Sequence, residues 1–449
     1  MRTTPFQHQT KALKFHLSLS RSADFSEMGT GKTRVAIELI EKRIKRGETE
    51  KALIIVPASI IDTWAYEIDK HSDFLTYTIL KGTNRKRLFE ETDPHCYIIS
   101  YDSLWKEMAK SLKEKGINFL ILDEVHKVKN PKAKRTKLTI QLADRCKYVL
   151  MMSGTPTPNS MEDVWSLFRI LDGGATFGRN FYKFLRDYFV AIPVSRRQPW
   201  LRKYKPRKIL YKIVKSRLKN LAVRFRKQDL PDLPDKLYVK VFVNLSREQV
   251  KYYNKVALGL NIDEFKFELP PNILAQYEKL QQITSGFFYL PDGVVRFENP
   301  KIKAVLDMLP SLTANGKKTV IVCKYREEIN QLREAIHPEP LVLSGDTINK
   351  HYIVNKFQTD PEEKVLVMQT SMGIGITLTA ADSMVFLSNT FSYSDRYQSE
   401  DRIHRASQEA KKVVYYDIIA KGTLDEKILK ILEEKRNRME KIMEEVKRP

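Results

Sequence analysis

The sequence is short of cysteine, of long apolar runs and of acidic residues, and the first two shortages exclude whole classes of protein. Its 3 cysteines, Cys96, Cys146 and Cys323, are far apart and form no Cys-x-x-Cys pair. Neither a disulfide framework nor a zinc site is therefore indicated. No apolar run approaches the roughly 20 residues of a membrane helix, and the polar residues 1–9 do not resemble a signal peptide. We expect a soluble, cytoplasmic protein with no membrane partner.

Acidic residues are outnumbered, since 78 Lys and Arg face 55 Asp and Glu and give a formal charge of +23. Residues 191–228 contain no acidic residue and include Trp200, Tyr204, Tyr211 and Phe225 among the bases, unlike a disordered basic tail. We interpret the segment as a phosphate-binding surface for nucleic acid, whose rings are available to stack on unpaired bases; a merely soluble basic protein is the alternative. Its bases include Arg196, Arg197, Arg202, Lys203, Lys205, Arg207, Lys208 and Lys227.

The pattern of apolar runs predicts an α/β protein with two lobes. Short β-branched runs separated by helical patterns indicate a parallel sheet, and such runs occur in both halves of the chain. They cover residues 52–56, 96–100, 119–122 and 148–152, then 319–323, 341–343, 365–368 and 384–387. Between them we expect basic, helical protrusions and a proline-containing linker at 230–235, and we expect a charged helix from Leu424. The predicted domains are 1–160, 161–300 and 301–440.

Residues 27–33, Glu-Met-Gly-Thr-Gly-Lys-Thr, predict a phosphate-binding loop. Gly29 and Gly31 permit close approach of backbone N–H groups to a phosphate, Lys32 reaches the β- and γ-phosphates, and Thr33 is a candidate Mg²⁺ ligand. A helix is expected to follow, since Val35, Leu39 and Ile40 recur on one face. The full pattern has glycine where Ser26 stands, so a structural turn is the alternative.

A second signal is the apolar run that ends in Asp123 and Glu124. At the carboxyl edge of a sheet, Asp123 would hold Mg²⁺ through water and Glu124 would orient and deprotonate the attacking water. The alternative is a solvated strand end.

In their order along the chain, these segments resemble the motifs of superfamily 2 helicases of the SWI/SNF-like group. Residues 398–408 match motif VI most specifically, in the form Gln-x-x-x-Arg-x-His-Arg-x-x-Gln. Residues 368–382 resemble motif V, although Thr370, Met372 and Thr377 depart from the usual residues. The other matches are residues 6–9 to the Q motif, 54–59 with Trp64 to motif Ia, 123–130 to motif II and 153–156 to motif III.

The resemblance covers residues 6 to about 432 and implies two RecA-like lobes with helical protrusions inserted between them. It implies ATP and Mg²⁺ as cofactors, with adenine read by Gln9 and the nucleotide contacted by Gly29, Thr30, Gly31, Lys32, Thr33, Gly375 and Gln398. Arg402 and Arg405 are predicted to share a helix face with Gln398 and would neutralise the charge on the γ-phosphate in the transition state. A solvated charged helix is the alternative. The implied DNA contacts are Ser59, Lys129, Lys324 and Thr370.

The resemblance therefore implies an ATP-dependent DNA helicase or translocase, which we expect to be monomeric. Its compactness is similar to that of small phage and bacterial helicases that act on forked or branched DNA in replication, recombination or repair, including branch migration. If it is phage-encoded, its location is the host cytoplasm. Two alternatives stay open: a duplex translocase that never separates strands, and a non-catalytic DNA-binding protein with a decayed nucleotide fold. An RNA helicase fits the form of motif VI less well.

Overall fold

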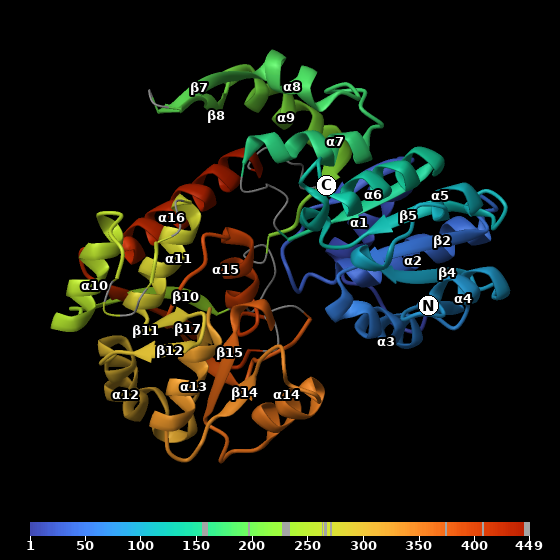
Figure 1. Ribbon diagram of the computed structural model, residues 1–449. Coiled ribbons are helices and arrows are strands. Elements are labelled where there is room, and N and C mark those ends of the chain that lie inside the picture. The colour runs from blue at the N-terminus through green and yellow to red at the C-terminus, as the bar shows by residue number, and fades with distance from the viewer. Residues whose placement is uncertain are drawn as a thin grey trace. The chain divides into compact units, whose positions relative to one another are not determined.

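The computed structural model describes residues 1–154, 160–195, 198–226, 234–262, 264, 267–269, 272–372, 375–405 and 408–443. The chain divides into two compact units, Met1–Leu230 with Asn437–Pro449, and Pro231–Arg436 (Figure 1). The boundaries predicted at residues 160 and 300 stay predictions. Among the described residues, no helix is both long and apolar enough to cross a bilayer.

A parallel sheet in the order β3-β4-β2-β5-β6-β1-β9 forms the centre of the first unit. The four runs predicted as strands here are β2, β4, β5 and β6. Every residue of β4 and β6 is buried, as expected of parallel strands covered on both faces. The strands are β1 (Arg21–Asp24), β2 (Lys51–Val56), β3 (Tyr77–Leu80), β4 (Cys96–Ser100), β5 (Ile117–Leu122), β6 (Tyr148–Met152) and β9 (Ala222–Val223).

The helix predicted after the phosphate loop is α2, whose buried face includes Val35, Leu39 and Ile40. Most of the other helices of this unit alternate with strands, as a parallel sheet requires, although two helices follow β6 in succession. The helices are α1 (Gln7–Leu17), α2 (Lys32–Lys45), α3 (Ile61–His71), α4 (Arg85–Glu91), α5 (Met108–Ser111), α6 (Lys134–Arg145), α7 (Val164–Leu171), α8 (Phe181–Tyr188) and α9 (Lys208–Leu221).

Residues 189–221, which follow α8, form the basic insertion. Part of this insertion is a β-hairpin, and the prediction of helix was wrong there. β7 (Phe189–Ser195) and β8 (Gln198–Pro206) pair antiparallel between α8 and α9, and Figure 1 shows the hairpin extending from these helices. Three prolines, Pro193, Pro199 and Pro206, oppose helix in this stretch, and its β-branched and aromatic residues favour strand. Arg196, Arg197 and Lys227 lie outside the described residues.

The second unit has its own parallel sheet, in the order β10-β17-β16-β13-β15-β14. The four predicted runs of this half are β13, β14, β15 and β16, and the C-terminal helix is α16. Most of the predicted linker, residues 230–233, lies outside the described residues, and Asp235 already belongs to β10. The strands are β10 (Asp235–Val243), β13 (Lys318–Cys323), β14 (Leu341–Leu343), β15 (Val365–Gln369), β16 (Ala381–Phe386) and β17 (Lys412–Ala420).

Seven helices and a small hairpin complete the described part of this unit. The hairpin pairs β11 (Phe287–Leu290) with β12 (Gly293–Arg296). The helices are α10 (Arg247–Ala257), α11 (Ile273–Thr284), α12 (Pro300–Leu312), α13 (Arg326–Ala335), α14 (Lys350–Thr359), α15 (Tyr393–Glu400) and α16 (Leu424–Met443), of which residues 424–436 belong to this unit.

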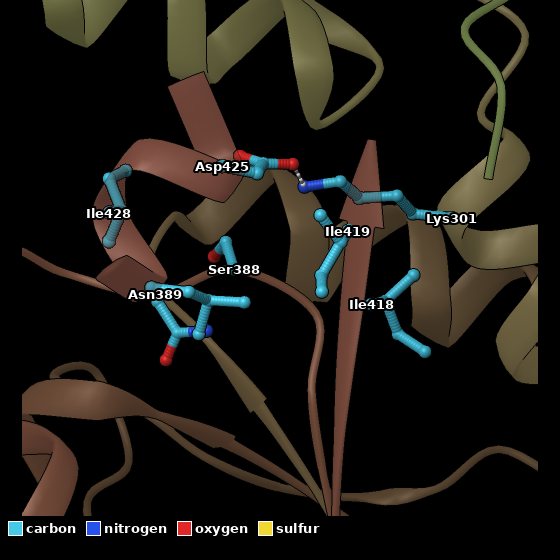
Figure 2. Close-up of a pocket in the computed structure, with 8 residues that line it drawn as sticks. Lys301, Ser388, Asn389, Ile418, Ile419, Asp425 and Ile428 are labelled. Atoms are coloured by element: carbon cyan, nitrogen blue, oxygen red, sulfur yellow. Dashed lines mark ion pairs between the residues drawn. The ribbon is translucent and has the colours of Figure 1, made fainter. Parts of the chain in front are cut away.

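A buried ion pair holds the start of α16 against this core. Lys301 Nζ lies 2.6 Å from Asp425 Oδ2, with only 1% and 10% of the two side chains exposed. Asp425 also accepts hydrogen bonds from Thr284 Oγ1 at 3.2 Å and from the backbone N of Ala420 at 3.0 Å. Figure 2 shows the pair beside a small cavity that Asn389 and other residues line. One carboxylate thus joins α11, α12, β17 and α16.

Removing only one charge of this pair should be more destabilising than removing both. Lys301→Met leaves a buried carboxylate without its cation, so we expect the free energy of unfolding of the second unit to fall by about 3 kcal/mol. Adding Asp425→Asn removes the unpaired carboxylate charge and keeps a hydrogen-bond acceptor. The double variant should therefore regain at least half of the lost free energy of unfolding. Urea unfolding followed by circular dichroism measures both, and additive losses in the double variant would contradict the prediction.

Candidate functional site

The phosphate loop has the backbone that the sequence predicts. Gly29 and Gly31 have φ of 77° and 82°, in the left-handed region that favours glycine, and Gly31 caps the N-terminus of α2. Lys32 Nζ donates hydrogen bonds to the carbonyls of Ser26 at 2.7 Å and Glu27 at 3.0 Å. The loop therefore points a lysine and a helix N-terminus at the same place, which suits a bound phosphate.

The predicted Q motif lies directly against this loop. Gln9 is 4% exposed; its Nε2 donates to the carbonyl of Thr30 at 3.2 Å and its Oε1 accepts from the backbone N of Phe6 at 3.0 Å. His8 Nε2 also lies 2.8 Å from the carbonyl of Thr30, a contact that the sequence analysis missed. A Cβ at Gly31 would lie 2.1 Å from Gln9 Nε2, so any other residue there would displace the Gln9 amide. Adenine recognition by Gln9 stays a prediction.

The acid pair after β5 is held by neighbours from other elements. Asp123 Oδ2 accepts from Trp64 Nε1 at 2.8 Å, and Asp123 Oδ1 accepts from the backbone N of Glu124 at 2.9 Å. Burial and the neighbouring carboxylate of Glu124 raise the pKa of Asp123 to about 6, although the Trp64 hydrogen bond opposes the rise. Trp64 was singled out by resemblance alone, and the structure places it on the carboxylate.

Glu124 has a backbone conformation that costs energy. Its φ of 49° lies in the left-handed region, which costs a non-glycine residue about 1–2 kcal/mol. Its Oε2 lies 3.2 Å from His126 Nδ1. Such strain is typical of functional positions, because surrounding contacts must hold the residue there.

The segment after β6 also approaches the phosphate loop. The backbone N of Ser153 donates to the carbonyl of Asp24 at 3.1 Å. A Cβ at Gly154 would lie 2.8 Å from Met28 Cγ and 3.9 Å from Lys32 Nζ. The described part of the predicted motif III therefore packs on the loop, while Thr155 and Pro156 lie outside the described residues.

The two arginines of the predicted motif VI do not share a helix with Gln398. The helix α15 ends at Glu400, and the backbone N–H groups of Arg402 and Ile403 bond to carbonyls three residues earlier, which makes a tight turn. The prediction of one helix face was wrong because the arginines bond to backbone beyond the helix. Arg402 Nη1 donates to the carbonyl of Ile376 at 3.0 Å.

Arg405 joins the predicted motifs V and VI in the second unit. Its Nη2 donates to the same Ile376 carbonyl at 2.8 Å and its Nη1 donates to Thr377 Oγ1 at 2.6 Å. Thr377, one of the departures from the usual motif V, is thereby bound by a motif VI arginine. Gly375, with φ of 80°, lies at the start of this turn.

The rest of α15 is held by a buried ionic cluster. The guanidinium of Arg396 binds Asp417 and, at 2.7 Å, Glu400, and Tyr238 OH donates to Glu400 at 2.8 Å. Burial alone would raise the pKa of Glu400, but Arg396 and Lys236 outweigh it and hold the pKa below its usual range. The neighbouring Gln398 is 2% exposed, and its Nε2 has no hydrogen-bond partner among the described residues.

The four DNA contacts implied by resemblance differ in their surroundings. Ser59 is exposed and Lys129 is half-buried. Lys324 Nζ is instead bound within the chain, at 2.8 Å from Glu278 Oε1 and 2.7 Å from Gln281 Oε1. Thr370 Oγ1 donates to the carbonyl of Cys323 at 3.0 Å. A phosphate at Lys324 would have to displace the carboxylate of Glu278.

The five bases singled out on β8 and the start of α9 are all exposed: Arg202, Lys203, Lys205, Arg207 and Lys208. Of the rings expected to be available for stacking, Phe225 packs inside the protein, whereas Tyr204 is half-buried. Phe225 is 7% exposed and lies 5.5 Å from the His8 ring, and Tyr204 lies 6.4 Å from the Phe189 ring between centroids. The stacking prediction was wrong for Phe225, because an aromatic ring gains more from burial than from exposure. The side chain of Trp200 lies outside the described residues.

Two family models match the chain. The model described as SNF2-related domain matches residues 8–286, and the model described as Helicase conserved C-terminal domain matches residues 300–407. They confirm the resemblance to the SWI/SNF-like group. The narrower similarity to compact phage and bacterial branched-DNA helicases stays a prediction.

The relatives are longer proteins. The chain is 27% identical over 436 residues to an uncharacterized ATP-dependent helicase of Mycoplasma genitalium, covering 93% of this chain and 40% of that one. It is 28% identical over 476 residues to the TATA-binding protein-associated factor mot1 of Aspergillus fumigatus, covering 90% and 25%. The chain therefore spans less than half the length of these relatives. It is also similar to the Sulfolobus solfataricus SWI2/SNF2 ATPase core in complex with dsDNA, with 23% identity, a TM-score of 0.45 and coverage of 99% and 93%.

The contact between Gly31 and Gln9 leads to a prediction with a matched control. Gly47 also has positive φ, 69°, but a Cβ there would meet nothing within 4 Å. Gly47→Ala should cost only the backbone strain of about 1–2 kcal/mol, whereas Gly31→Ala should cost about 2 kcal/mol more, because it displaces Gln9. Urea unfolding compares the two, and a fluorescent ATP analogue should bind the Gly47 variant normally and the Gly31 variant weakly. Equal losses in both variants would show that the contact is unimportant.

Proposed function

This chain belongs to the SNF2-related domain family, and we propose that it is an ATP-driven motor that moves along DNA. The observation that carries the proposal is the assembly on the first unit. The loop with Lys32 is held by Gln9, Gly154 packs on the same loop, and Trp64 fixes the carboxylate of Asp123. A decayed nucleotide fold would have no reason to retain these contacts together.

The proposed chemistry is hydrolysis of ATP with Mg²⁺. The Thr33 hydroxyl and, through water, Asp123 fit that ion, because Mg²⁺ in nucleotide sites takes few protein oxygens and keeps several waters. When bound, Mg²⁺ would neutralise charge on the phosphates. Lys32 would bind the β- and γ-phosphates, and Glu124 would orient the attacking water and accept its proton.

Further nucleotide contacts are proposed from the family motifs. Gln9 is proposed to read adenine, and Gly375 and Gln398 to contact the nucleotide. The buried Gln398 Nε2, which has no hydrogen-bond partner in the part of the chain that the structure describes, supports a role for that side chain. We propose that Arg402 and Arg405 stabilise transition-state charge, so their loss should reduce hydrolysis and leave DNA binding in place.

The proposed DNA contacts are Ser59, Lys129, Lys324 and Thr370, together with the basic hairpin. Five exposed bases on β8 and the start of α9, with no acid among them, suit the phosphate backbone of any sequence. The proposed substrate is forked or branched DNA, as found in replication, recombination or repair. The hairpin offers a second basic surface, in addition to the contacts with the DNA along which the motor moves, and a second DNA arm could bind there. Translocation on duplex without strand separation is the second candidate, since motors of this family share the same motifs.

The test is ATP turnover and strand displacement on four DNA substrates at equal concentration: single-stranded, duplex, forked and four-way. We expect turnover to be stimulated by DNA and displacement to be fastest on the fork or the four-way junction. Lys32→Ala and Glu124→Gln should each reduce turnover by about 10²-fold or more, without unfolding the protein. Stimulated turnover without displacement would favour the duplex translocase, and normal turnover in either variant would refute the site.

Neutralising the hairpin should weaken DNA binding for all sequences. Changing Arg202, Lys203, Lys205, Arg207 and Lys208 to Gln should reduce the dependence of log K on log salt by up to about 0.9 for each lost phosphate contact. The matched control changes five other exposed lysines of the same unit, Lys11, Lys14, Lys86, Lys110 and Lys113, which alters net charge equally. Equal effects in both variants would mean that only net charge matters.

A further inference from the structure

The segment that leaves the basic insertion runs beside the phosphate loop. β9 follows α9 directly and pairs in parallel with β1. Beyond the paired strands, the backbone N of Phe25 donates to the carbonyl of Val223 at 2.9 Å, and the backbone N of Glu27 donates to the carbonyl of Phe225 at 3.0 Å. The strand pairing therefore continues into the loop itself.

Ser26 adds a side-chain bond to this pairing. Its Oγ accepts from the backbone N of Phe225 at 3.0 Å, and the residue is 2% exposed. Its own backbone N donates to Asp24 Oδ1 at 2.9 Å, and its carbonyl accepts from Lys32 Nζ at 2.7 Å. The glycine expected at this position of a phosphate loop has no hydroxyl, so the departure from the pattern creates a contact.

Other contacts join the same two segments. Arg224 Nη2 lies 3.6 Å from Glu27 Oε1. The ring of Phe225 packs on His8, whose Nε2 lies 2.8 Å from the carbonyl of Thr30. Residues 223–225 therefore touch the loop at Ser26 and Glu27 and, through His8, at Thr30.

The segment is continuous with the proposed DNA surface. β8 carries exposed bases, α9 starts two residues after it, and β9 follows α9 without a loop. α9 packs through Val214 and Leu218, with a small apolar cavity between these residues and Phe25, which follows β1. Incomplete packing leaves room for a small shift of α9, whereas the hydrogen bonds at its end tie β9 to the loop.

We propose that Ser26 is a positioning residue through which DNA on the basic insertion adjusts the phosphate loop and so raises ATP turnover. The inference rests on the proposed function. A shift of α9 on binding DNA moves Phe225, and the Ser26 hydroxyl transmits that movement to the carbonyl that holds Lys32. The hydroxyl matters for stimulation by DNA rather than for the fold alone.

The experiment measures ATP turnover of the full chain with and without saturating duplex DNA, and takes the ratio as the stimulation factor. Ser26→Ala should lower this factor about fivefold, the equivalent of one ordinary hydrogen bond, and Ser26→Gly should do the same. Ser26→Thr retains a hydroxyl and should restore it. A further variant combines Ser26→Ala with neutralisation of the five hairpin bases. Its fold-loss of the stimulation factor should be smaller than the product of the fold-losses in the two separate variants.

Three results would overturn the inference. The first is an equal loss of turnover with and without DNA in Ser26→Ala, the second is an unchanged stimulation factor in that variant, and the third is a combined loss of stimulation equal to the product of the two separate losses. Each result would limit Ser26 to holding the loop. Absence of stimulation in the unmodified chain would instead contradict the proposed function, and the inference with it.

A second measurement uses the unmodified chain, in case the variants do not fold. Duplex DNA should change hydrogen exchange in peptides that cover residues 222–226 and 25–31 together, while β4 stays unchanged. A change confined to the hairpin would overturn the inference.

Discussion

The parallel pairing of β5, β6, β1 and β9 is the constraint on which the site of the first unit depends. Leu122 pairs with Met151, and Asp24 pairs with both Met152 and Val223, so four strands end at one level. The residues that follow those ends are the acid pair, the Ser153–Gly154 turn, the phosphate loop and the Phe225 segment. Because parallel strands place their carboxyl ends on the same edge, segments far apart in the chain meet there.

The polar groups at this edge of the sheet are hydrogen-bonded to one another. Buried polar groups cost energy unless they are paired, and here the partners come from neighbouring strand ends. Asp123 is bound by Trp64, Thr30 by Gln9 and His8, and Ser26 by Phe225. The strain at Glu124 is sustained by the same surroundings. Preorganised groups of this kind suit the stabilisation of developing charge.

The second unit uses a buried ionic cluster for a similar purpose. Arg396, which has no place in the motif VI pattern, binds both Glu400 and Asp417, whereas Arg402 and Arg405 bind the Ile376 turn. A buried ion pair contributes little net stability, because desolvation offsets its attraction, but it fixes geometry. The cluster therefore orients the turn that carries the two motif arginines.

By itself the sequence determined four strands in each parallel sheet and the glycine backbone of the predicted phosphate loop, because both depend on local signals. The strands β4 and β6 begin and end at the predicted residues, and Gly29 and Gly31 adopt the backbone that only glycine takes readily. The hairpin at β7 and β8 was not predicted from the sequence, because the many basic residues of this segment favoured a helix and its prolines and β-branched residues were given too little weight. Only the tertiary structure decided that Phe225 meets Ser26, 199 positions away, and that Glu278 binds Lys324. Such contacts depend on strand order and register, which no spacing along the chain encodes.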